Sequence, residues 1–473
     1  MRSGRCLYVG AVVVALVIGL GLWNPIRVKA DHDRDRATRF RVDPSWPKPL
    51  PVTVINGVAH RWVQGEVAGT CVDSHNHVFT TNRGWQAGVV VGGVTFGNES
   101  GALVGQDATA SSIPSPPIVA FDEDGRVVTS FGDATLFQAG DLSLPPGAEP
   151  GGAKVMPHGA HGCFVDYQDN VWVGGNGDGI VQKYSHDGTL LLQIGQKGVC
   201  DGPTNNTNVA GGGANVFPTC GDAHDGNNST TLLNEPADMA VDPDANEVYI
   251  ADGYGNHRIV VFDATTGAFK RQWGSSCGHN ELPGGGNPCP AGTFGATGGG
   301  HPHCVVLGND GLVYVCDRPN NRIQIFTKSG IWQKTIYVLP PDPTNPKQAA
   351  ILLAGTRACD MTFYPNVDYL AGKSPTRQKY IVDVDLGNDN VWLLDKASGA
   401  MLSGFGRCGL GPCPGHNAGE FAFAHTVSTD THGNVYIAET ITGRRMQKFV
   451  RVDDDDHNDR DHHDRDGHDR DHH

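Results

Sequence analysis

Short apolar runs separated by glycine- and aspartate-containing turns recur along most of this chain, between residues 60 and 450. In the clearest unit the runs cover residues 237–242, 248–252, 258–262 and 269–274, and each has the length and alternation of a β-strand. We count six such units along the chain. A lone four-stranded sheet cannot bury both of its faces, whereas neighbours in a closed ring can. The pattern therefore predicts an all-β fold, a six-bladed β-propeller.

The last unit has only three of its four expected strands, at residues 425–430, 435–438 and 446–450. Near the N-terminus, residues 61–65 (Arg-Trp-Val-Gln-Gly) resemble the end of a fourth strand at 272–274 (Gln-Trp-Gly). We therefore expect this N-terminal strand to pair with the last unit and close the ring. Closure would also cover a strand edge that is open to aggregation.

The two ends of the chain differ in composition from the repeats and divide it into four segments. Residues 1–30 combine two early arginines, an apolar run and a Val-Lys-Ala site, which predicts a secretory signal peptide, with an uncleaved membrane anchor as the alternative. Residues 31–39 form a short charged linker and 40–451 the propeller. Residues 452–473, rich in Asp, His and Arg, are expected to be a disordered tail, either merely solvated or weakly metal-binding. We expect a secreted, periplasmic or extracellular protein with no membrane span after maturation.

Three histidines occupy one position of the repeat in alternate units. His161, His303 and His425 each precede the second strand of their unit by ten residues. The other three units carry small residues there: Ala68 and, approximately, Ala237 and Cys359. Alternate blades lie a third of a turn apart, so the three imidazoles should converge on the axis. Three histidines with an open fourth position are typical of catalytic zinc, although imidazole also suits copper, iron and nickel. With unperturbed imidazoles, metal binding would weaken below pH ~6; the alternative reading is chance placement among 21 histidines.

The loops that follow the second strands add polar side chains on the same face. Arg83, Tyr254 and Arg318 lie in these loops in units one, three and four. A phenol near a metal ion and two guanidinium groups can have a lowered pKa and act as a base. Two arginines can hold a carboxylate. The alternative for each of these residues is an exposed turn position.

Together these residues resemble peptidyl-α-hydroxyglycine α-amidating lyase, and residues 251–259 look like an NHL repeat. The resemblance covers roughly residues 40–450 and implies a six-bladed NHL-type propeller. It implies that the three histidines hold zinc, that Tyr254 is the catalytic tyrosine, and that Arg83 and Arg318 are active-site arginines. Arg318 lies in an Asp-Arg-x-x-x-Arg-Ile-Gln motif at 317–324.

Two residues beside the third histidine depart from that family: Phe423 replaces a methionine, and the second departure concerns calcium. The family has an aspartate after the third histidine that holds a structural calcium, and this chain has Thr426 there. The resemblance therefore does not carry over that Ca²⁺ ligand, although backbone carbonyls near Thr70 and Cys163 could still contribute to a site.

The resulting functional prediction is a zinc-dependent carbon–nitrogen lyase that converts an N-acyl-α-hydroxyglycine-like substrate to an amide and glyoxylate. We expect it to act as a monomer on a small molecule or a peptide. An alternative is a non-catalytic NHL propeller that binds a protein, glycan or cell-wall partner on the histidine face. A calcium-dependent lactonase-like propeller is disfavoured, because Ca²⁺ prefers oxygen ligands. The net charge of −15 argues against a nucleic-acid partner.

Twelve cysteines in an exported chain predict disulfides. Three pairs flank loops that each pair could close: Cys200 with Cys220, Cys277 with Cys289, and Cys408 with Cys413. Cys304 and Cys316 could pair across a hairpin. Apart from Cys6, which lies in the expected signal peptide, Cys71, Cys163 and Cys359 remain, and we expect these three to be small buried residues.

Overall fold

The computed structural model describes the parts of the chain that form the repeats. These are residues 39–83, 89–91, 94–96, 112–132, 156–157, 159–177, 179–196, 199–201, 228–279, 288–295, 301–338, 357–365, 378–406 and 415–452. The expected signal peptide, most of the linker and nearly all of the tail lie outside the described residues.

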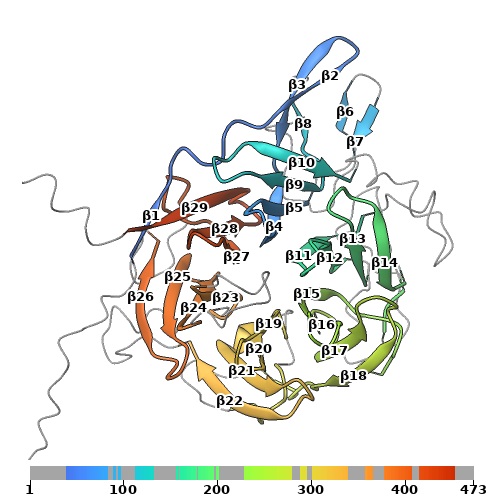
Figure 1. Ribbon diagram of the computed structural model, residues 1–473, viewed down its shortest axis with the longest axis vertical. Helices are drawn as coiled ribbons and strands as arrows, with labels where there is room; N and C mark the ends of the chain where they lie inside the picture. Colours follow the sequence, from blue (N-terminus) through green and yellow to red (C-terminus); the bar gives the residue numbers. More distant parts are fainter. Residues whose placement is uncertain are drawn as a thin grey trace, which may run out of the picture. The chain divides into compact units, whose positions relative to one another are not determined.

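The first three blades follow one another along the chain (Figure 1). Blade one consists of β4 (Glu66–Val72), β5 (Val78–Arg83), β9 (Ile118–Phe121) and β10 (Val127–Phe131). Blade two consists of β11 (Ala160–Val165), β12 (Val171–Gly175), β13 (Ile180–Tyr184) and β14 (Leu190–Gly195). Blade three consists of β15 (Pro236–Asp242), β16 (Glu247–Asp252), β17 (Arg258–Asp263) and β18 (Phe269–Trp273).

The other three blades complete the circle. Blade four consists of β19 (Cys304–Leu307), β20 (Leu312–Asp317), β21 (Arg322–Thr327) and β22 (Trp332–Tyr337). Blade five consists of β23 (Asp360–Tyr364), β24 (Tyr380–Asp385), β25 (Asn390–Asp395) and β26 (Met401–Phe405). Blade six consists of β27 (Ala424–Thr429), β28 (Val435–Glu439), β29 (Arg445–Val452) and β1 (Arg39–Val42).

The six sheets form a closed ring. The first strand of each blade is innermost and contacts the first strands of both neighbours, from β4 through β11, β15, β19, β23 and β27 back to β4. The predicted six-bladed all-β propeller is therefore confirmed. Within the described residues the only helix is a 3-10 turn, η3 (Arg318–Asn320). No helix among these residues is long and apolar enough to cross a membrane.

An N-terminal strand closes the ring, but it is not the predicted one. β1 pairs antiparallel with β29, from Arg39 opposite Val452 to Val42 opposite Phe449. The expected segment 61–65 instead overlaps β3 (Val58–Val63), which joins β2 (Val52–Ile55) and β8 (Ser112–Pro114) in a separate three-stranded sheet.

Chain length explains why the expected segment cannot close the ring. Only Gln64 and Gly65 lie between β3 and the innermost strand β4, and the three Cα–Cα steps from Val63 to Glu66 span at most ~11 Å. The outer and inner strands of a four-stranded blade are three strand spacings apart, about 14 Å. β1 is followed by a connection long enough to cover that distance. A short hairpin, β6 (Val89–Val91) with β7 (Val94–Phe96), was also not predicted.

The hydrophobic core is divided into six clusters, one between each pair of neighbouring blades. Phe79 of blade one packs with Val173 of blade two, and Val67 of blade one packs with Tyr436 of blade six. The remaining four interfaces have equivalent clusters. Because every inner strand is packed on both sides, the starts of these strands are fixed points around the axis.

Disulfides reinforce the propeller at three described places. Cys277 is bonded to Cys289 and Cys304 to Cys316, as expected. Cys71 and Cys163 were expected to be separate buried residues, but they form a disulfide that joins β4 of blade one to β11 of blade two. Cys200 is also disulfide-bonded, and Cys359 is the free cysteine of the described residues. Cys220, Cys408 and Cys413 lie outside the described residues.

Candidate metal centre

The start of each inner strand carries an irregularity that turns one residue out of the regular strand pairing. The pairing shifts register between Val67 and Gly69, between Pro236 and Asp238, and between Ala424 and Thr426. Ala68, Ala237 and His425 are the residues left without a partner in the regular strand pairing. In blade two the shift between Ala160 and Cys163 includes His161. Bulges of this kind commonly re-aim a side chain next to a functional site.

Blades four and five show the same feature just before the strand begins. The N–H groups of His303 and Cys359 donate to the carbonyls of Cys316 and Val384, at 2.8 and 3.0 Å. These two acceptors are the strand partners of the residues that follow, Cys304 and Asp360. The six equivalent positions thus alternate around the ring between histidine and a small residue.

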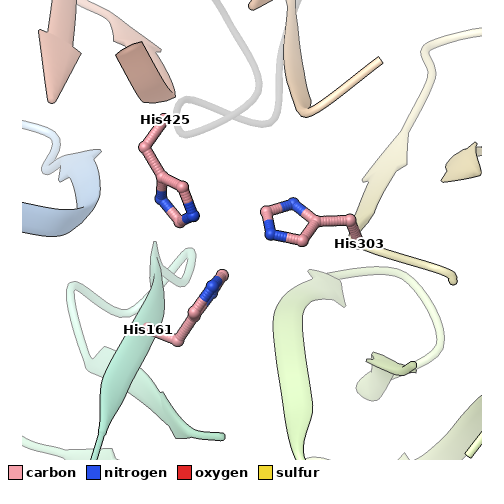
Figure 2. A group of neighbouring side chains, drawn as sticks. All are labelled: His161, His303 and His425. Atoms are coloured by element: carbon pink, nitrogen blue, oxygen red, sulfur yellow. The ribbon is translucent and has the colours of Figure 1, made fainter. Parts of the chain in front are cut away.

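The three histidines point toward one another from separate blades (Figure 2). One ring nitrogen from each of His161, His303 and His425 lies within 4.8 Å of the other two. The ring centroids are 4.9, 4.6 and 5.1 Å apart, and each residue is at most 3% exposed. The register read from the sequence therefore corresponds to one compact imidazole cluster.

A backbone carbonyl of the next blade orients each imidazole. The Nδ1 groups donate to Ala237 O at 2.7 Å (His161), to Cys359 O at 2.6 Å (His303) and to Ala68 O at 2.7 Å (His425). A carbonyl only accepts, so Nδ1 carries the hydrogen and Nε2 keeps its lone pair. The small residues that the sequence suggested merely as space therefore supply the acceptors that fix the tautomer.

Burial keeps these imidazoles neutral. Desolvation is the main reason that the pKa of His161 and of His303 lies well below its usual value. Burial, with Arg83 and Arg318, lowers the pKa of His425 to about 3. Neutral imidazole is the form that binds metals. The sequence-based limit of pH ~6 for metal binding assumed unperturbed histidines, whereas burial lowers the pKa of all three; the pH dependence of metal binding stays a prediction.

Tyr254 and Arg318 complete the cluster. The Tyr254 hydroxyl lies 3.1 Å from Nε2 of His161 and 3.0 Å from Nε2 of His303. Nη1 of Arg318 donates to the same hydroxyl oxygen at 3.1 Å, with the guanidinium carbon 5.3 Å from the phenol ring centre. Burial raises the pKa of Tyr254, and Arg318 and Arg83 offset this only in part. These side chains alone therefore raise the pKa of Tyr254, and the expectation of a lowered pKa, which included a metal ion beside the phenol, stays a prediction.

The loop that carries Tyr254 is held by a buried carboxylate at the end of β16. Asp252 accepts hydrogen bonds from Asn256 Nδ2 at 2.8 Å and from Arg258 Nε at 2.9 Å. Its oxygen Oδ1 also accepts from the N–H of Asn234 at 2.8 Å. The Asp-x-x-x-Asn-x-Arg pattern in the sequence is therefore a clamp that fixes the turn around the tyrosine.

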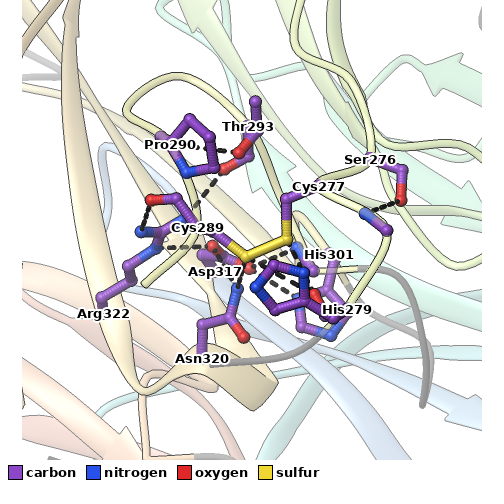
Figure 3. Close-up of a disulfide and its surroundings, with 12 residues drawn as sticks. Ser276, Cys277, His279, Cys289, Pro290, Thr293, His301, Asp317, Asn320 and Arg322 are labelled. Atoms are coloured by element: carbon purple, nitrogen blue, oxygen red, sulfur yellow. Dashed lines mark hydrogen bonds and ion pairs between the residues drawn. A yellow bond between two sulfur atoms is a disulfide. The ribbon is translucent and has the colours of Figure 1, made fainter. Parts of the chain in front are cut away.

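The loop that carries Arg318 has the same clamp with an added disulfide (Figure 3). Asp317 accepts from Arg322 Nε at 2.7 Å, Asn320 Nδ2 at 2.9 Å and His301 Nδ1 at 2.6 Å. Arg322 also donates to the carbonyl of Cys289, which is bonded to Cys277. Because these two sulfurs are joined to each other, the nearby His279 is not part of a thiolate metal site.

Arg83 is close to the cluster but is engaged by neighbours that the sequence did not reveal. Its guanidinium donates to Glu66 at 3.2 Å, to Asn176 Oδ1 at 3.3 Å and to the carbonyl of Ala160 at 3.1 Å. Its charge contributes to the lowered pKa of His161 and of His425. Arg83 is thus positioned beside the imidazoles, and part of its hydrogen-bonding capacity is used by Glu66.

Two further aspartates accept hydrogen bonds from inner-strand N–H groups two residues after a histidine. Asp238 accepts from the N–H of Val305 at 3.1 Å, and Asp360 accepts from that of Val427 at 2.9 Å. Burial raises the pKa of both, to about 7 for Asp360. Both line a cavity of about 130 Å³. Asp238 and Asp360 directly follow Ala237 and Cys359, the small residues at the histidine position, and this was the signal available in the sequence.

Thr426, which replaces the aspartate of the resembled family, offers only a neutral oxygen. Its hydroxyl is buried and has no hydrogen-bond partner among the residues that the structure describes. The structure therefore adds no charged calcium ligand at this position.

The sequence is similar to a known repeat family and to several curated proteins. Residues 233–262 and 300–326 match the NHL repeat. Peptidylglycine alpha-amidating monooxygenase of Rattus norvegicus is 27% identical over 266 residues, which is 55% of this chain and 20% of that protein. Peptidyl-glycine alpha-amidating monooxygenase B of Xenopus laevis is 38% identical over 104 residues, 22% of this chain and 10% of that protein. Human NHL repeat-containing protein 3 is 30% identical over 183 residues, 37% of this chain and 41% of that protein.

Solved structures resemble the chain more remotely. A protein of unknown function from Bacteroides thetaiotaomicron aligns with a TM-score of 0.46 at 13% identity, over 88% of this chain and 76% of the other. A streptogramin B lyase structure aligns with a TM-score of 0.41 at 13% identity, over 82% and 94%. Likeness at this level says nothing about chemistry. The chain spans a fifth or less of the amidating enzymes quoted above, and it carries NHL repeats on a six-bladed propeller with distant similarity to peptidylglycine alpha-amidating monooxygenase.

Proposed function

We propose that this protein is a divalent-metal-dependent lyase that cleaves the C–N bond of an N-acyl-α-hydroxyglycine-like substrate. The observation that carries the proposal is the grouping of three Nε2 atoms with one phenol and one arginine. Tyr254 lies within 3.1 Å of two of the imidazoles and of Arg318. The similarity to the amidating enzymes supports the same reading.

The three histidines suit a transition metal such as zinc. Their Nδ1 atoms are occupied as donors, their Nε2 lone pairs converge, and their lowered pKa values keep them neutral. Three imidazoles leave a coordination position for a substrate oxygen, as in catalytic rather than structural zinc sites. When bound there, a divalent ion supplies Lewis acidity toward that oxygen.

Tyr254 would move the proton that the reaction requires. With the Nε2 lone pairs used for coordination, the phenol loses two acceptors, while Arg318 still donates to its oxygen and favours the phenolate. The phenolate takes the hydroxyl proton of the substrate, the carbon–oxygen bond becomes a carbonyl, and the C–N bond breaks. The departing nitrogen takes the proton back from Tyr254. The products are an amide and glyoxylate, and atoms and charge balance.

The arginines would hold the carboxylate of the substrate. Arg318 is 8% exposed and next to Tyr254, so its guanidinium faces the reacting group. Arg83 has five N–H groups, and the structure shows acceptors for three of them. A carboxylate that approached both guanidiniums would be oriented with its α-carbon toward the imidazoles.

Release of glyoxylate tests the proposal directly. Metal-loaded protein should release glyoxylate from α-hydroxyhippurate faster than the spontaneous reaction, and chelator-treated protein should not. Replacement of any one of the three histidines by alanine should abolish the activity and remove the one metal ion held on the axis. If metal-loaded protein leaves α-hydroxyhippurate and a hydroxyglycine-terminated peptide unchanged, the substrate assignment is wrong.

We also propose that the protein is exported. Described disulfides at Cys71–Cys163, Cys277–Cys289 and Cys304–Cys316 support this, because such bonds persist in oxidising compartments. Fractionation of the producing cell, with N-terminal sequencing of the mature chain, tests both the location and the cleavage of residues 1–30.

A further inference from the structure

The turn between the first two strands of a blade contains a recurring aspartate clamp. In blade two, Asp166 accepts the backbone N–H of Asn170 at 3.0 Å, the Asn170 amide at 3.0 Å and Trp172 Nε1 at 2.9 Å. In blade six, Asp430 accepts the N–H of Asn434 at 2.8 Å, its side-chain amide and the Tyr436 hydroxyl at 2.9 Å. The clamp thus uses an asparagine four residues after the aspartate and an aromatic donor six residues after it.

Blade one departs from this pattern at both donor positions. The asparagine is replaced by His77, and the aromatic donor by Phe79, which has no N–H or O–H to give. Blade two supplies the missing contact through His186, in the turn between β13 and β14. Its ring stacks edge-on against Phe79, with centroids 5.3 Å apart. An amide and an aromatic donor, which serve the other two clamps as hydrogen-bond donors, are therefore replaced by two imidazoles, which can also coordinate a metal.

The carboxylate of Asp73 is fixed and directed at these imidazoles. Its Oδ1 accepts the N–H groups of His75 and His77 at 2.9 and 2.7 Å. Its Oδ2 lies 2.9 Å from His77 Nδ1 and 2.8 Å from His186 Nε2. The backbone therefore holds one oxygen, and the other is shared by two ring nitrogens from different blades.

We propose that Asp73, His77 and His186 form a second binding site for a divalent transition-metal ion, separate from the histidines on the axis. One ligand atom from each lies within 4.8 Å of the other two. Two imidazoles and a carboxylate are a donor set for zinc, and nickel and copper accept it as well. Each imidazole can present its lone pair by moving its proton to the other ring nitrogen, so no ionisation is needed.

The site is accessible and can adjust to an ion. The Asp73 side chain is fully buried, whereas those of His77 and His186 are 29% and 39% exposed. Ligands of tetrahedral zinc are about 3.3 Å apart, so the rings must move back from the 2.9 and 2.8 Å seen here by about half an ångström. Partly exposed rings can do this, and a water molecule can fill the fourth position.

The position in the fold separates this site from the axial one. His161, His303 and His425 lie at the beginnings of inner strands, whereas Asp73 follows the end of β4. Neighbouring inner strands run in the same direction, so the two sites lie at opposite ends of them. An ion bound by Asp73, His77 and His186 would link blade one to blade two, beside the Cys71–Cys163 disulfide.

Zinc titration of the full-length protein tests the proposal. The first variant, His77→Asn, restores the residue that blades two and six use, so the clamp keeps an amide donor and loses a ligand. The second variant, His186→Gln, removes the ligand from the other blade. His75→Asn is the matched control: His75 lies in the same turn with its side chain 68% exposed, and it is outside the three-residue cluster.

Equilibrium dialysis with elemental analysis should find one more tightly bound Zn²⁺ per chain in wild type and His75→Asn than in His77→Asn and His186→Gln. Loss of a direct ligand should weaken this site by about a hundredfold or more. All four proteins keep the axial histidines and both Asp/His-rich ends, so the difference reports only this cluster. Circular dichroism should show that the variants are folded. Equal stoichiometry and affinity in all four would overturn the proposal, whether or not the protein releases glyoxylate.

Discussion

The Tyr254→Phe variant probes whether the central cluster performs chemistry. The change removes one oxygen atom and keeps the ring that packs between His161 and His303. That oxygen lies 3.1 and 3.0 Å from two Nε2 atoms and accepts from Arg318 at 3.1 Å. The three Nδ1 contacts with backbone carbonyls do not involve it. The variant should therefore keep the metal-binding imidazoles and lose the group that moves the proton.

The expected loss of rate follows from that role. A positioned acid–base group contributes about 10²–10⁴-fold, which corresponds to roughly 3–5 kcal/mol of transition-state stabilisation. Glyoxylate release from α-hydroxyhippurate would give kcat and KM, and elemental analysis would give the metal content of the same samples. We expect kcat to fall by this factor with one metal per axial site retained.

Tyr249→Phe is a matched control from the same blade. Its hydroxyl is also buried and bonded to charged groups, Glu247 and Arg271, but it lies outside the histidine cluster. This variant should lose some stability and keep its rate. If Tyr254→Phe binds metal and retains a rate within about threefold of wild type, the proton-transfer role is refuted. A binding platform without catalysis would then be the better reading of the same face.

Three further outcomes follow from the geometry. Replacing Cys71 and Cys163 together by serine opens a cross-link that spans 92 residues and should lower the free energy of unfolding by about 4–5 kcal/mol in denaturant titrations; a change below ~1 kcal/mol would contradict this. Because burial lowers the pKa of the axial histidines, the neutral ligating form persists into acid, and dialysis at pH 5 should leave the axial metal bound; release already between pH 6 and 7 would be inconsistent with that burial. Gly69→Ala would place a Cβ 2.2 Å from the carbonyl of His161, so it should reduce axial metal content at equal protein concentration, and normal content would show that the backbone relaxes freely.

The repeat was readable from the sequence because each blade must bury both faces. Alternation and turn residues located the strands closely, as residues 237–242 against β15 (Pro236–Asp242) and 425–430 against β27 (Ala424–Thr429) show. Ring closure was harder, because β1 has only four residues and little apolar character, Arg-Phe-Arg-Val. Residues 61–65 match the end of a fourth strand better in sequence, and only the shortness of their connection to β4 rules them out.

The axial histidines were also predictable, because a spacing of ten residues to the second strand marks one position in the ring. The groups that surround the axial histidines were not predictable from the sequence. The carbonyls of Ala68, Ala237 and Cys359 act through the backbone, which leaves no trace in residue type. Glu66 and Asn176 reach Arg83 from blade one and from the end of β12, at sequence separations of 17 and 93 residues. Glu66 is the strand partner of Arg83 within blade one, so that contact follows from the register of β4 and β5, whereas the Asn176 contact depends on how blades one and two pack.

The contacts between blades explain why the cluster is as compact as it is. Each histidine itself links its blade to the next one, because its Nδ1 donates to a backbone carbonyl there. This joins blade two to three, four to five and six to one. Two aspartates make the contacts on the other side. Asp238 of blade three accepts from the N–H two residues after His303, and Asp360 of blade five accepts from the N–H two residues after His425. From blades one to two, where Gly69 has no side chain to do this, the Cys71–Cys163 disulfide makes the link two residues beyond His161. Every histidine is thus held from both sides, so the position of the three imidazoles is a property of the closed ring and cannot be built from any single repeat.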